Sequence, residues 1–502
     1  MPTFHLLNFG CRASQADGAA LKQQLLAAGY EESAQIEESH VAVLNTCTVT
    51  ATADAEVRQL VRRIHRRKPR CRILVTGCYA QRAPEEIAKL PGVALVVGNS
   101  HKHLIGELLA RSGESGVRSP ESVQPAPSAL VQITGANTST APASALASAF
   151  PNPESRVANP DSRLPTPDTQ HPTSDPLLPI PESRVANPES PQIFVGSIPA
   201  EFHFAPVFPD DRTRPTLKVQ DGCNARCSFC VIPSVRGRSR SLAPDKIIEQ
   251  VRELEARGYR EIVLSGINLG SYGRDLGRRI NFLGLLERLL EETAIPRLRI
   301  SSIELMDVSP ALVRLAAREE RMARHFHVPL QSGSDRILRL MRRRYWACQY
   351  AERILSIHEQ IPNAALGADV MVGFPGETAE DHAASAGLIA SLPFTYLHVF
   401  PYSARPGTPA ASMPNPVNGR VAHERGQELR ALVAEKRRAF LAAQVGRVLS
   451  AVTLDEMEGD ARVALTTNYL KVALPGSTIP DNRLVDVWIG RASDRMLYGV
   501  SG

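Results

Sequence analysis

The stretch TLKVQDGCNARCSFC, residues 216–230, decides how most of this 502-residue chain is interpreted. TLKVQ predicts a short strand, and Cys223, Cys227 and Cys230 follow it in the spacing C-x3-C-x2-C. Thiolates are the usual ligands of iron–sulfur clusters, and three thiols leave one iron of a cubane cluster without a protein ligand. A zinc finger is the alternative, but it needs a fourth Cys or His at finger-like distance. No His lies between Asp221 and the end of the helix that follows.

The segment around this stretch, residues 211–440, alternates short strands with helices. We expect strands at 216–220, 261–267, 297–303, 326–331, 365–373 and 396–403. Six strand–helix units are two fewer than a complete barrel of this type contains. The pattern therefore predicts a partial, open (β/α)6 barrel, with its active site at the carboxyl ends of the strands.

An N-terminal segment, residues 1–111, alternates in the same way and predicts an open parallel α/β sheet. Cys11, Cys47 and Cys78 each follow a predicted strand by one or two residues. Because the carboxyl ends of parallel strands meet at one edge of a sheet, these three thiols are expected to form a shared metal centre. The alternative is three buried small side chains, which is the common environment of a free cysteine. Cys71 and Cys348 are expected to be structural.

Two further segments differ in composition. Residues 112–210 contain 18 of the 38 prolines and repeat PESRVANP at 153–160 and 181–188, which predicts a disordered insert rich in Pro, Ser and Ala. It is either a plain linker or a partner-binding segment. Residues 441–502 carry five short alternating strands without helices between them, which predicts a small β-barrel.

Charge and hydropathy favour a cytoplasmic chain. The net charge of +6 suits a polyanionic partner without proving one. The N-terminus lacks the basic and apolar regions of an export signal, and no apolar run is long enough to span a bilayer. We therefore expect no membrane association, and reduced thiols rather than disulfides.

Two basic stretches are candidate RNA contacts. RQLVRRIHRRKPRCR (58–72), if helical, places Arg58, Arg62 and Arg66 in one row that phosphates would contact, or that is simply solvated. MRRRYW (341–346) sets three arginines beside two aromatic residues, a combination that suits single-stranded RNA. The arginines are Arg342, Arg343 and Arg344. The two aromatic residues are alternatively part of the core.

CNARCSFC resembles the signature of radical S-adenosylmethionine enzymes, in which the cofactor's amino and carboxylate groups chelate the open iron. Phe229 offers an aromatic surface beside that iron. LSGIN (264–268), PLQSGSDRIL (329–338) and GADVMVGFPGE (367–377) resemble the family segments that contact the cofactor. The resemblance implies cofactor contacts at Ser265, Gly266, Asn268, Gln331, Ser332 and Asp369.

The whole chain except the insert resembles the methylthiotransferase family of these enzymes. The resemblance implies that Cys11, Cys47 and Cys78 hold a second 4Fe–4S cluster and that the C-terminal barrel is an RNA-binding domain of the TRAM type. NTCTVT (45–50), GINLGSYGRD (266–275), LQSGSDRILRLMRRRY (330–345) and HVFPYSARPGTPA (398–410) are most similar to the MtaB branch. That branch is implied to convert N6-threonylcarbamoyladenosine at position 37 of tRNA, in the anticodon loop, to its 2-methylthio derivative.

The chemistry fits two clusters. An aromatic C–H at carbon 2 of adenine resists acid–base and nucleophilic attack, whereas a radical can abstract its hydrogen. The cluster on Cys223, Cys227 and Cys230 would cleave S-adenosylmethionine to a 5′-deoxyadenosyl radical, and the second cluster would carry the sulfur. A flavodoxin or ferredoxin as reductant and a monomeric chain are expected. The alternatives are the isopentenyladenosine branch, the ribosomal-protein branch and a non-enzymatic, metal-bearing RNA-binding protein.

Overall fold

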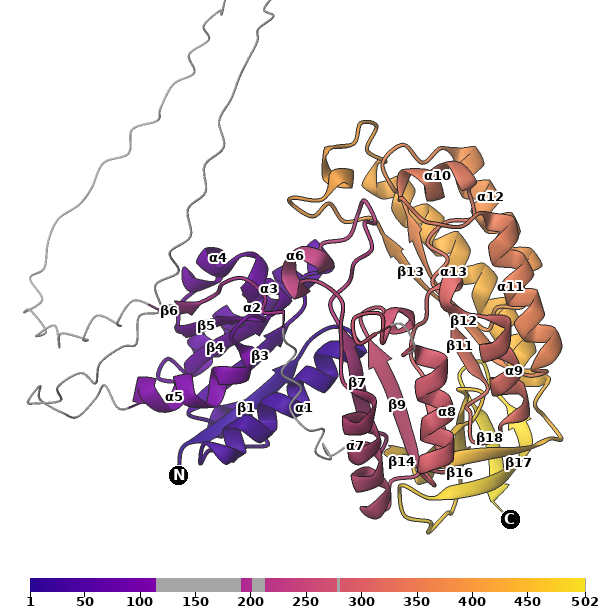
Figure 1. The fold of residues 1–502 in the computed structure, drawn as a ribbon, viewed down its shortest axis with the longest axis horizontal. Coiled ribbons are helices and arrows are strands. Elements are labelled where there is room, and N and C mark those ends of the chain that lie inside the picture. The colour runs from indigo at the N-terminus through magenta and orange to yellow at the C-terminus, as the bar shows by residue number, and fades with distance from the viewer. Residues whose placement is uncertain (114–190, 201–212, 278–279, 502) are drawn as a thin grey trace, which may run out of the picture. The chain divides into compact units, whose positions relative to one another are not determined.

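The computed structural model describes residues 1–113, 191–200, 213–277 and 280–501, which form an N-terminal sheet, a partial barrel and a small closed barrel (Figure 1). The predicted fold class is therefore confirmed. No helix among these residues has both the length and the apolar character that crossing a bilayer requires.

The N-terminal sheet is entirely parallel, in the order β2-β1-β3-β4-β5-β6. Leu44 of β3 packs with Val57 of α2, whereas the adjacent Val43 packs with Leu21 of α1, so helices cover both faces of the sheet. Its elements are β1 (Thr3–Asn8), α1 (Arg12–Ala27), β2 (Glu31–Glu32), η1 (Ile36–Glu38), β3 (Val41–Thr46), α2 (Ala51–Arg67), β4 (Arg72–Gly77), α3 (Cys78–Arg82), α4 (Pro84–Ala88), β5 (Val93–Gly98), η2 (Lys102–Leu104), α5 (Ile105–Gly113) and β6 (Gln192–Phe194).

The edge strand β6 lies inside the range that we predicted as an insert. It pairs in parallel with β5, with Leu95 opposite Gln192 and Val97 opposite Phe194. The prediction that the insert runs over 112–210 is thus corrected at its start, because α5 reaches Gly113, and within its range, because residues 192–194 complete the sheet. Three residues between prolines are too short a pattern to predict a strand; only pairing with β5 defines it. The other insert positions, 114–190 and 201–212, lie outside the described residues.

The partial barrel consists of two parallel groups of strands, β10-β9-β7 and β11-β12-β13, with the short β8 pairing antiparallel to β7. In the described part of the chain β7 and β13 are not paired, so the barrel is open between them. The strands are β7 (Thr216–Asp221), β8 (Arg240–Ser241), β9 (Glu261–Gly266), β10 (Arg297–Ile300), β11 (His325–His327), β12 (Ala365–Val372) and β13 (Tyr396–Pro401). The helices are α6 (Ile232–Arg236), α7 (Pro244–Ala256), η4 (Leu269–Ser271), α8 (Phe282–Glu292), η5 (Leu305–Asp307), α9 (Pro310–Arg318), α10 (Asp335–Leu340), α11 (Ala347–Gln360), α12 (Ala379–Ser391) and η6 (Pro409–Ser412).

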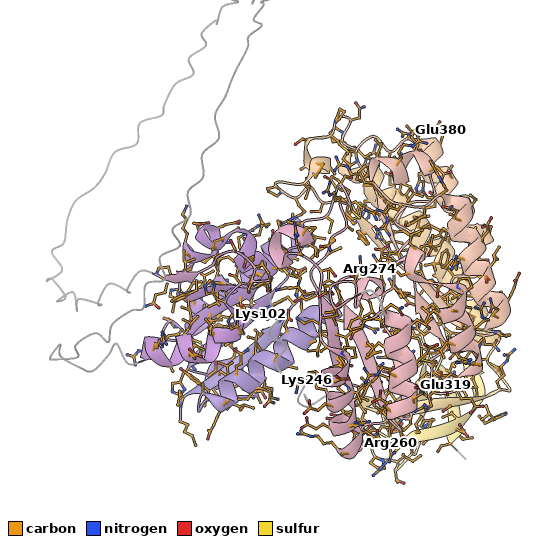
Figure 2. The ribbon with its side chains drawn as sticks, in the orientation of Figure 1. Lys102, Lys246, Arg260, Arg274, Glu319 and Glu380 are labelled. Carbon is orange, nitrogen blue, oxygen red and sulfur yellow. The ribbon has the colours of Figure 1, made fainter. Side chains whose placement is uncertain are left out.

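Alternation along the barrel strands separates a core from a polar lumen. Leu264 and Leu298 pack against the helices, whereas Glu261 and Arg299, on the other face of the same strands, bond to each other. Exposed charges such as Lys246 and Glu380 lie on the outer helices α7 and α12 (Figure 2). The predicted strand at 326–331 is shorter than expected: β11 ends at His327, and beyond it Gln331 forms an isolated bridge with Val370.

The C-terminal strands form a closed barrel in the order β14-β15-β16-β18-β17. They follow the long helix α13 (Gly419–Ala442), whose Leu441 belongs to the core of this barrel. The strands are β14 (Val448–Glu458), β15 (Ala461–Thr466), β16 (Lys471–Leu474), β17 (Leu484–Ala492) and β18 (Leu497–Ser501). Closure removes the exposed strand edges that a small sheet would otherwise present.

Candidate active site formed by two cysteine sets

The first cysteine set, Cys11, Cys47 and Cys78, is brought together at the carboxyl ends of the adjacent strands β1, β3 and β4. Glycines make this approach possible. A side chain at Gly10 (φ 97°) would place its Cβ 2.6 Å from Cβ of Cys47, and one at Gly77 (φ 99°) would lie 2.4 Å from a backbone oxygen. Burial, together with the neighbouring thiols of Cys78 and Cys11, raises the pKa of Cys47 to about 11. Three thiols gathered at one edge of the sheet are arranged as ligands for a cation.

The first set also faces residues of the barrel. Asn99 donates its side-chain amide to Cys78 Sγ at 3.6 Å and to the backbone oxygen of Val235 in α6 at 2.8 Å. Cys78 packs against Val231 and Val235, which follow Cys230. Helix α6 therefore joins the two cysteine sets.

The second cysteine set, Cys223, Cys227 and Cys230, lies in the loop after β7, as predicted from the sequence. Backbone Ala225 and the Asn268 side chain donate to Cys223 Sγ at 3.4 and 3.6 Å. Burial, together with the neighbouring thiols of Cys227 and Cys223, raises the pKa of Cys230 to about 12. The loop is fixed to α10, because Ser228 donates to the backbone oxygens of Met341 and Leu340 at 3.0 and 2.8 Å.

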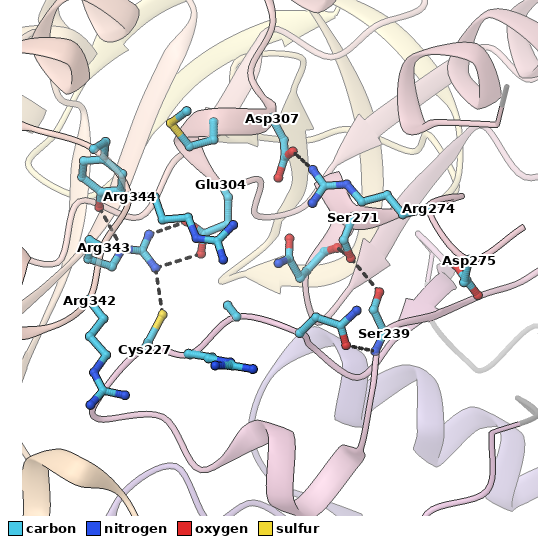
Figure 3. A pocket seen from close by; sticks show the side chains of 16 residues that line it. Cys227, Ser239, Ser271, Arg274, Asp275, Glu304, Asp307, Arg342, Arg343 and Arg344 are labelled. Atoms are coloured by element: carbon cyan, nitrogen blue, oxygen red, sulfur yellow. Dashed lines mark hydrogen bonds and ion pairs between the residues drawn. The ribbon is translucent and has the colours of Figure 1, made fainter. Parts of the chain in front are cut away.

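A cavity of about 360 Å³ opens beside this loop (Figure 3). Arg343 donates to Cys227 Sγ at 3.5 Å and to Glu304 at 3.2 Å (Figure 3). Asn268 and the Arg274–Asp307 ion pair also line the cavity. Polar groups of both signs converge next to three thiols, as expected for a cofactor with both a cationic and an anionic end.

The predicted cofactor contacts differ in what surrounds their side chains. Asn268 lines the cavity, and its Oδ1, like Oε1 of Gln331, is a buried acceptor without a hydrogen-bond partner in the described residues. Ser265 and Ser332 are fully buried, and the Ser332 hydroxyl bonds to Ser385 at 3.3 Å. Phe229 packs in an apolar cluster with Met341, Met371 and Phe374. A side chain at Gly266 would meet Gln220 Oε1 at 2.9 Å.

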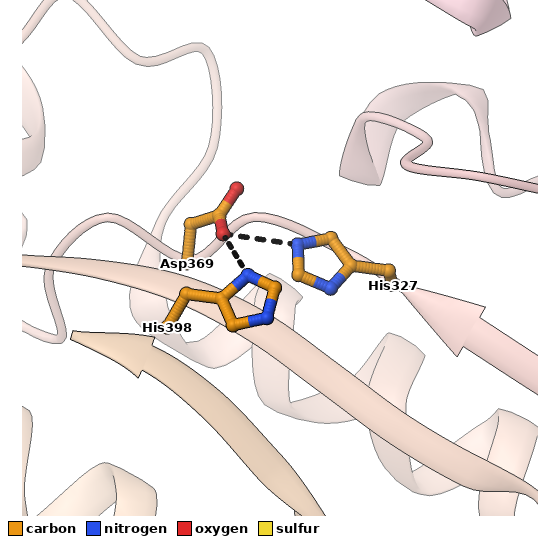
Figure 4. A group of neighbouring side chains, drawn as sticks. All are labelled: His327, Asp369 and His398. Atoms are coloured by element: carbon orange, nitrogen blue, oxygen red, sulfur yellow. Dashed lines mark hydrogen bonds and ion pairs between the residues drawn. The ribbon is translucent and has the colours of Figure 1, made fainter. Parts of the chain in front are cut away.

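The last predicted contact, Asp369, lies in the lumen between two histidines (Figure 4). Its Oδ1 is 3.1 Å from both His327 Nε2 and His398 Nδ1. Burial raises the pKa of Asp369, but the hydrogen bonds from both histidines outweigh it and hold the pKa below its usual range. The three ligand atoms lie within 4.8 Å of one another, so this group has the donors for a transition metal, although here they satisfy each other.

Only some of the arginines in the two basic stretches are exposed. Arg62 and Arg66 are exposed on α2, whereas Arg58 donates to Tyr79 and Glu86, both at 2.8 Å. Arg342 and Arg344 are exposed. Interpreting Arg343 as an RNA contact is wrong, because its side chain is 6% exposed and bound to Glu304 and Cys227.

The two aromatic residues that follow these arginines, and the two remaining cysteines, lie in different environments. Tyr345 is core, whereas Trp346 is 43% exposed with Arg339 over its ring. Cys71 is buried as expected, but Cys348 is exposed.

Sequence reasoning missed one charged cluster between the two sets. Asp17 of α1 accepts hydrogen bonds from Arg236 at 2.8 Å, from Lys102 at 3.0 Å and from Lys218. Burial raises the pKa of Asp17, but the three cations together hold it well below its usual value. Burial lowers the pKa of Arg236, but Cys78, Asp17, Asp221 and Cys11 outweigh it and raise the pKa well above its usual value. No local pattern marks these residues, because they come from different elements.

Two family models match the chain. Residues 3–98 match the family described as "Uncharacterized protein family UPF0004", and residues 217–389 match the radical SAM superfamily. Together they cover both cysteine sets.

Curated proteins are similar over almost the whole length. The Bacillus subtilis threonylcarbamoyladenosine tRNA methylthiotransferase MtaB is 33% identical over 97% of this chain and 93% of that protein. The Aquifex aeolicus protein of the same name is 34% identical over 93% and 95%. A tRNA-2-methylthio-N(6)-dimethylallyladenosine synthase from Pelotomaculum thermopropionicum is 31% identical over 86% and 81%.

A solved structure shares the fold. The radical S-adenosylmethionine methyltransferase TsrM from Kitasatospora setae, with cobalamin and a 4Fe–4S cluster bound, superposes with a TM-score of 0.51. It covers 82% of this chain and 77% of its own at 14% identity, so the similarity is one of fold alone.

Proposed function

The chain belongs to the radical SAM tRNA methylthiotransferase family, and we propose that it adds a methylthio group to carbon 2 of N6-threonylcarbamoyladenosine at position 37 of tRNA. The observation that carries the proposal is the pair of three-thiol sets, each at the carboxyl ends of parallel strands and joined by α6. A single radical centre would need only the second set.

The cofactors are S-adenosylmethionine and two 4Fe–4S clusters. The residues present fit them, because each set offers three thiols. In addition, the acceptors Asn268 Oδ1 and Gln331 Oε1, which have no hydrogen-bond partner among the described residues, match donors such as an ammonium group. We assign Cys223, Cys227 and Cys230 to the cluster that binds S-adenosylmethionine and Cys11, Cys47 and Cys78 to the second cluster. When bound, these groups supply the one-electron chemistry that an aromatic C–H requires, together with the sulfur.

The chain's own residues position this chemistry. Arg343 holds Glu304 against the second cysteine set, which keeps the carboxylate oriented toward the cavity. Asn268 is fixed by a backbone hydrogen bond to Gln220 at 2.8 Å and donates to Cys223. Phe229 and its apolar neighbours exclude water from the other side of the loop.

The tRNA would bind through exposed cations and the C-terminal barrel. Arg62, Arg66, Arg342 and Arg344 are exposed and available to phosphates. Arg58 contacts a tRNA phosphate only if it gives up its hydrogen bond to Glu86. With tRNA as substrate, the reaction takes place in the cytoplasm. A flavodoxin or ferredoxin supplies the electrons, and the active form is a monomer.

One alternative substrate has a specific observation in its favour. The relative from Pelotomaculum thermopropionicum carries a dimethylallyladenosine name at 31% identity, close to the values for the threonylcarbamoyladenosine enzymes. Nucleoside analysis of tRNA decides between them. In a strain lacking this chain, 2-methylthio-N6-threonylcarbamoyladenosine should disappear and its unmethylthiolated precursor should accumulate. Loss of the 2-methylthio-dimethylallyl nucleoside instead would assign the other substrate.

A complementation series controls this experiment. The wild-type gene should restore the nucleoside, whereas a Cys227→Ala gene should not. A Cys348→Ala gene is the matched control, because Cys348 is exposed and belongs to neither set.

A further inference from the structure

The lower end of the barrel lumen gathers several arginines around a single buried carboxylate. Glu261 is fully buried and accepts from Arg299 at 2.7 and 3.1 Å and from Arg214 at 3.0 Å, while Arg297 lies 3.6 Å away. We call this group, together with Arg12 and Tyr469, the lumen floor.

Arg12 adds a fourth guanidinium. It donates to the Tyr469 hydroxyl at 2.8 Å, and Arg12 and Arg299 lie over the same ring at 5.6 and 5.3 Å. Among the described residues no carboxylate pairs with Arg12, and its Nη1 is buried without an acceptor. Nη1 of Arg297, by contrast, lies 3.6 Å from Oε2 of Glu261. The floor thus contains a guanidinium donor, on Arg12, that no acceptor within the described residues satisfies.

The charges of the floor do not balance. Three guanidiniums surround the Glu261 carboxylate, and Arg12 lies over the same Tyr469 ring as Arg299 without a carboxylate of its own in the part of the chain that the structure describes. An uncompensated buried charge is costly. Burial, with Arg299 and Arg12 next in effect, lowers the pKa of the adjacent His325 well below its usual value. The excess positive charge favours an anionic ligand.

Space for such a ligand adjoins the floor. Arg12, Arg214 and Tyr469 line a cavity of about 380 Å³, and Arg214 and Tyr469 also line one of about 480 Å³ that includes Tyr396 and His398. The acids on these cavities, Asp455 and Glu456, are at least 40% exposed and lie by Arg462 and Lys471. They do not neutralise Arg12.

We propose that the lumen floor, through Arg12, binds the carboxylate of the threonylcarbamoyl group on N6 of the substrate adenosine. The inference rests on the proposed function. A carboxylate is the anion that a guanidinium matches in shape and charge, and a dimethylallyl group offers none.

The length of strand β9 accommodates a substrate base whose carbon 2 lies at the cofactor end and whose N6 substituent reaches the lumen floor. Val263 lines the same cavity as Arg12 and lies three residues, about 10 Å, before Gly266 at the cofactor end of β9. A base with carbon 2 at the cofactor end would extend its N6 substituent along that length toward the floor. His398, held by Asp369, lines the second cavity beside this path.

The test measures equilibrium binding of anticodon stem-loops that are identical except at position 37. These carry N6-threonylcarbamoyladenosine, its methyl ester, unmodified adenosine or dimethylallyladenosine. The wild-type chain should prefer the free carboxylate, and Arg12→Gln should lower affinity for it by about tenfold or more while leaving the ester and adenosine unchanged. Arg12→Lys should retain part of the preference, and Arg314→Gln, an exposed arginine on α9, should change nothing.

Any other result contradicts either the carboxylate subsite or the proposed function on which it rests. If Arg12→Gln lowers the affinity for all four stem-loops equally, Arg12 contacts a phosphate and the carboxylate subsite is overturned. An undiminished preference for the carboxylate would overturn it as well, with the proposed function intact. A wild-type preference for dimethylallyladenosine would remove the proposed function itself. If Arg12→Gln does not fold, the wild-type chain still decides, because equal affinity for N6-threonylcarbamoyladenosine and its methyl ester would overturn the subsite.

Discussion

Arg236 donates a hydrogen bond to the carboxylate of Asp17 at 2.8 Å, and this contact connects the two cysteine sets. Asp17 lies six residues after Cys11, and Arg236 lies six residues after Cys230. Arg236 also donates to Asp221, two residues before Cys223 of the second set, at 3.1 Å. The same guanidinium therefore fixes the helix that begins after one set and the loop that carries the other.

Loss of the Asp17 charge should destabilise the chain. Asp17→Asn keeps the side-chain size but leaves Lys102, Lys218 and Arg236 without their shared acceptor, so the free energy of unfolding should fall by about 3–5 kcal/mol. Chemical denaturation measures the change. Glu249→Gln is the control, because it removes an exposed partner of Lys246 and should leave the midpoint unchanged. Equal midpoints for the two variants would contradict the role of Asp17.

Glu261 should make stability depend on pH in the acid range. Burial raises the pKa of Glu261, but Arg299, Arg214 and Arg297 outweigh it and lower the pKa from 4.5 to about 2. Because the folded pKa lies below the unfolded value, the stabilisation is complete above about pH 4.5 and is lost as pH falls toward 2. It amounts to roughly 3 kcal/mol.

The check is denaturant unfolding at a series of pH values. Glu261→Gln should be less stable at pH 7 and should show a shallower decrease between pH 4.5 and 2. An identical pH profile for the variant and the wild type would show that Glu261 is not the group responsible.

The two cysteine sets should have separable duties. Cys227→Ala should abolish 5′-deoxyadenosine formation, whereas Cys47→Ala should retain it and lose only transfer of the methylthio group. Each variant should bind about four irons instead of about eight. Chromatography of the nucleosides, with iron analysis of anaerobically purified protein, provides the measurement. If Cys47→Ala forms no 5′-deoxyadenosine although the second cysteine set still binds its iron, the two sets do not have separate duties.

Adjacent arginines should behave differently. Arg342 is exposed, so Arg342→Gln should weaken tRNA binding and reduce the slope of log affinity against log salt by about one. Arg343 is buried against Glu304 and Cys227, so Arg343→Gln should leave that slope unchanged and lower the rate of S-adenosylmethionine cleavage. Binding titrations at several salt concentrations separate the two, and a common salt effect would show that both arginines contact RNA.

The sequence predicts this fold well where information is local. The short apolar runs within 41–45 and 261–267 are sufficient to predict strands, and the position of Cys11, Cys47 and Cys78 after strands is sufficient to bring them together. It cannot predict partners distant in the chain. Arg343 stands in a run of arginines that indicates a surface, and only the fold places Glu304 beside it. Asp17 likewise occupies a helix whose sequence gives no sign that three cations converge on it.

The edge strand β6 has a consequence for synthesis of the chain. The first sheet is incomplete until residues 192–194 leave the ribosome, although its other strands end at Gly98. At 5–20 residues per second, the roughly 80 residues between α5 and β6 delay closure by about 4–16 seconds. During that interval β5 is a free edge, open to pairing with another nascent chain. A ribosome that pauses within the proline-rich stretch would lengthen this interval, so translation speed there should affect the yield of folded protein.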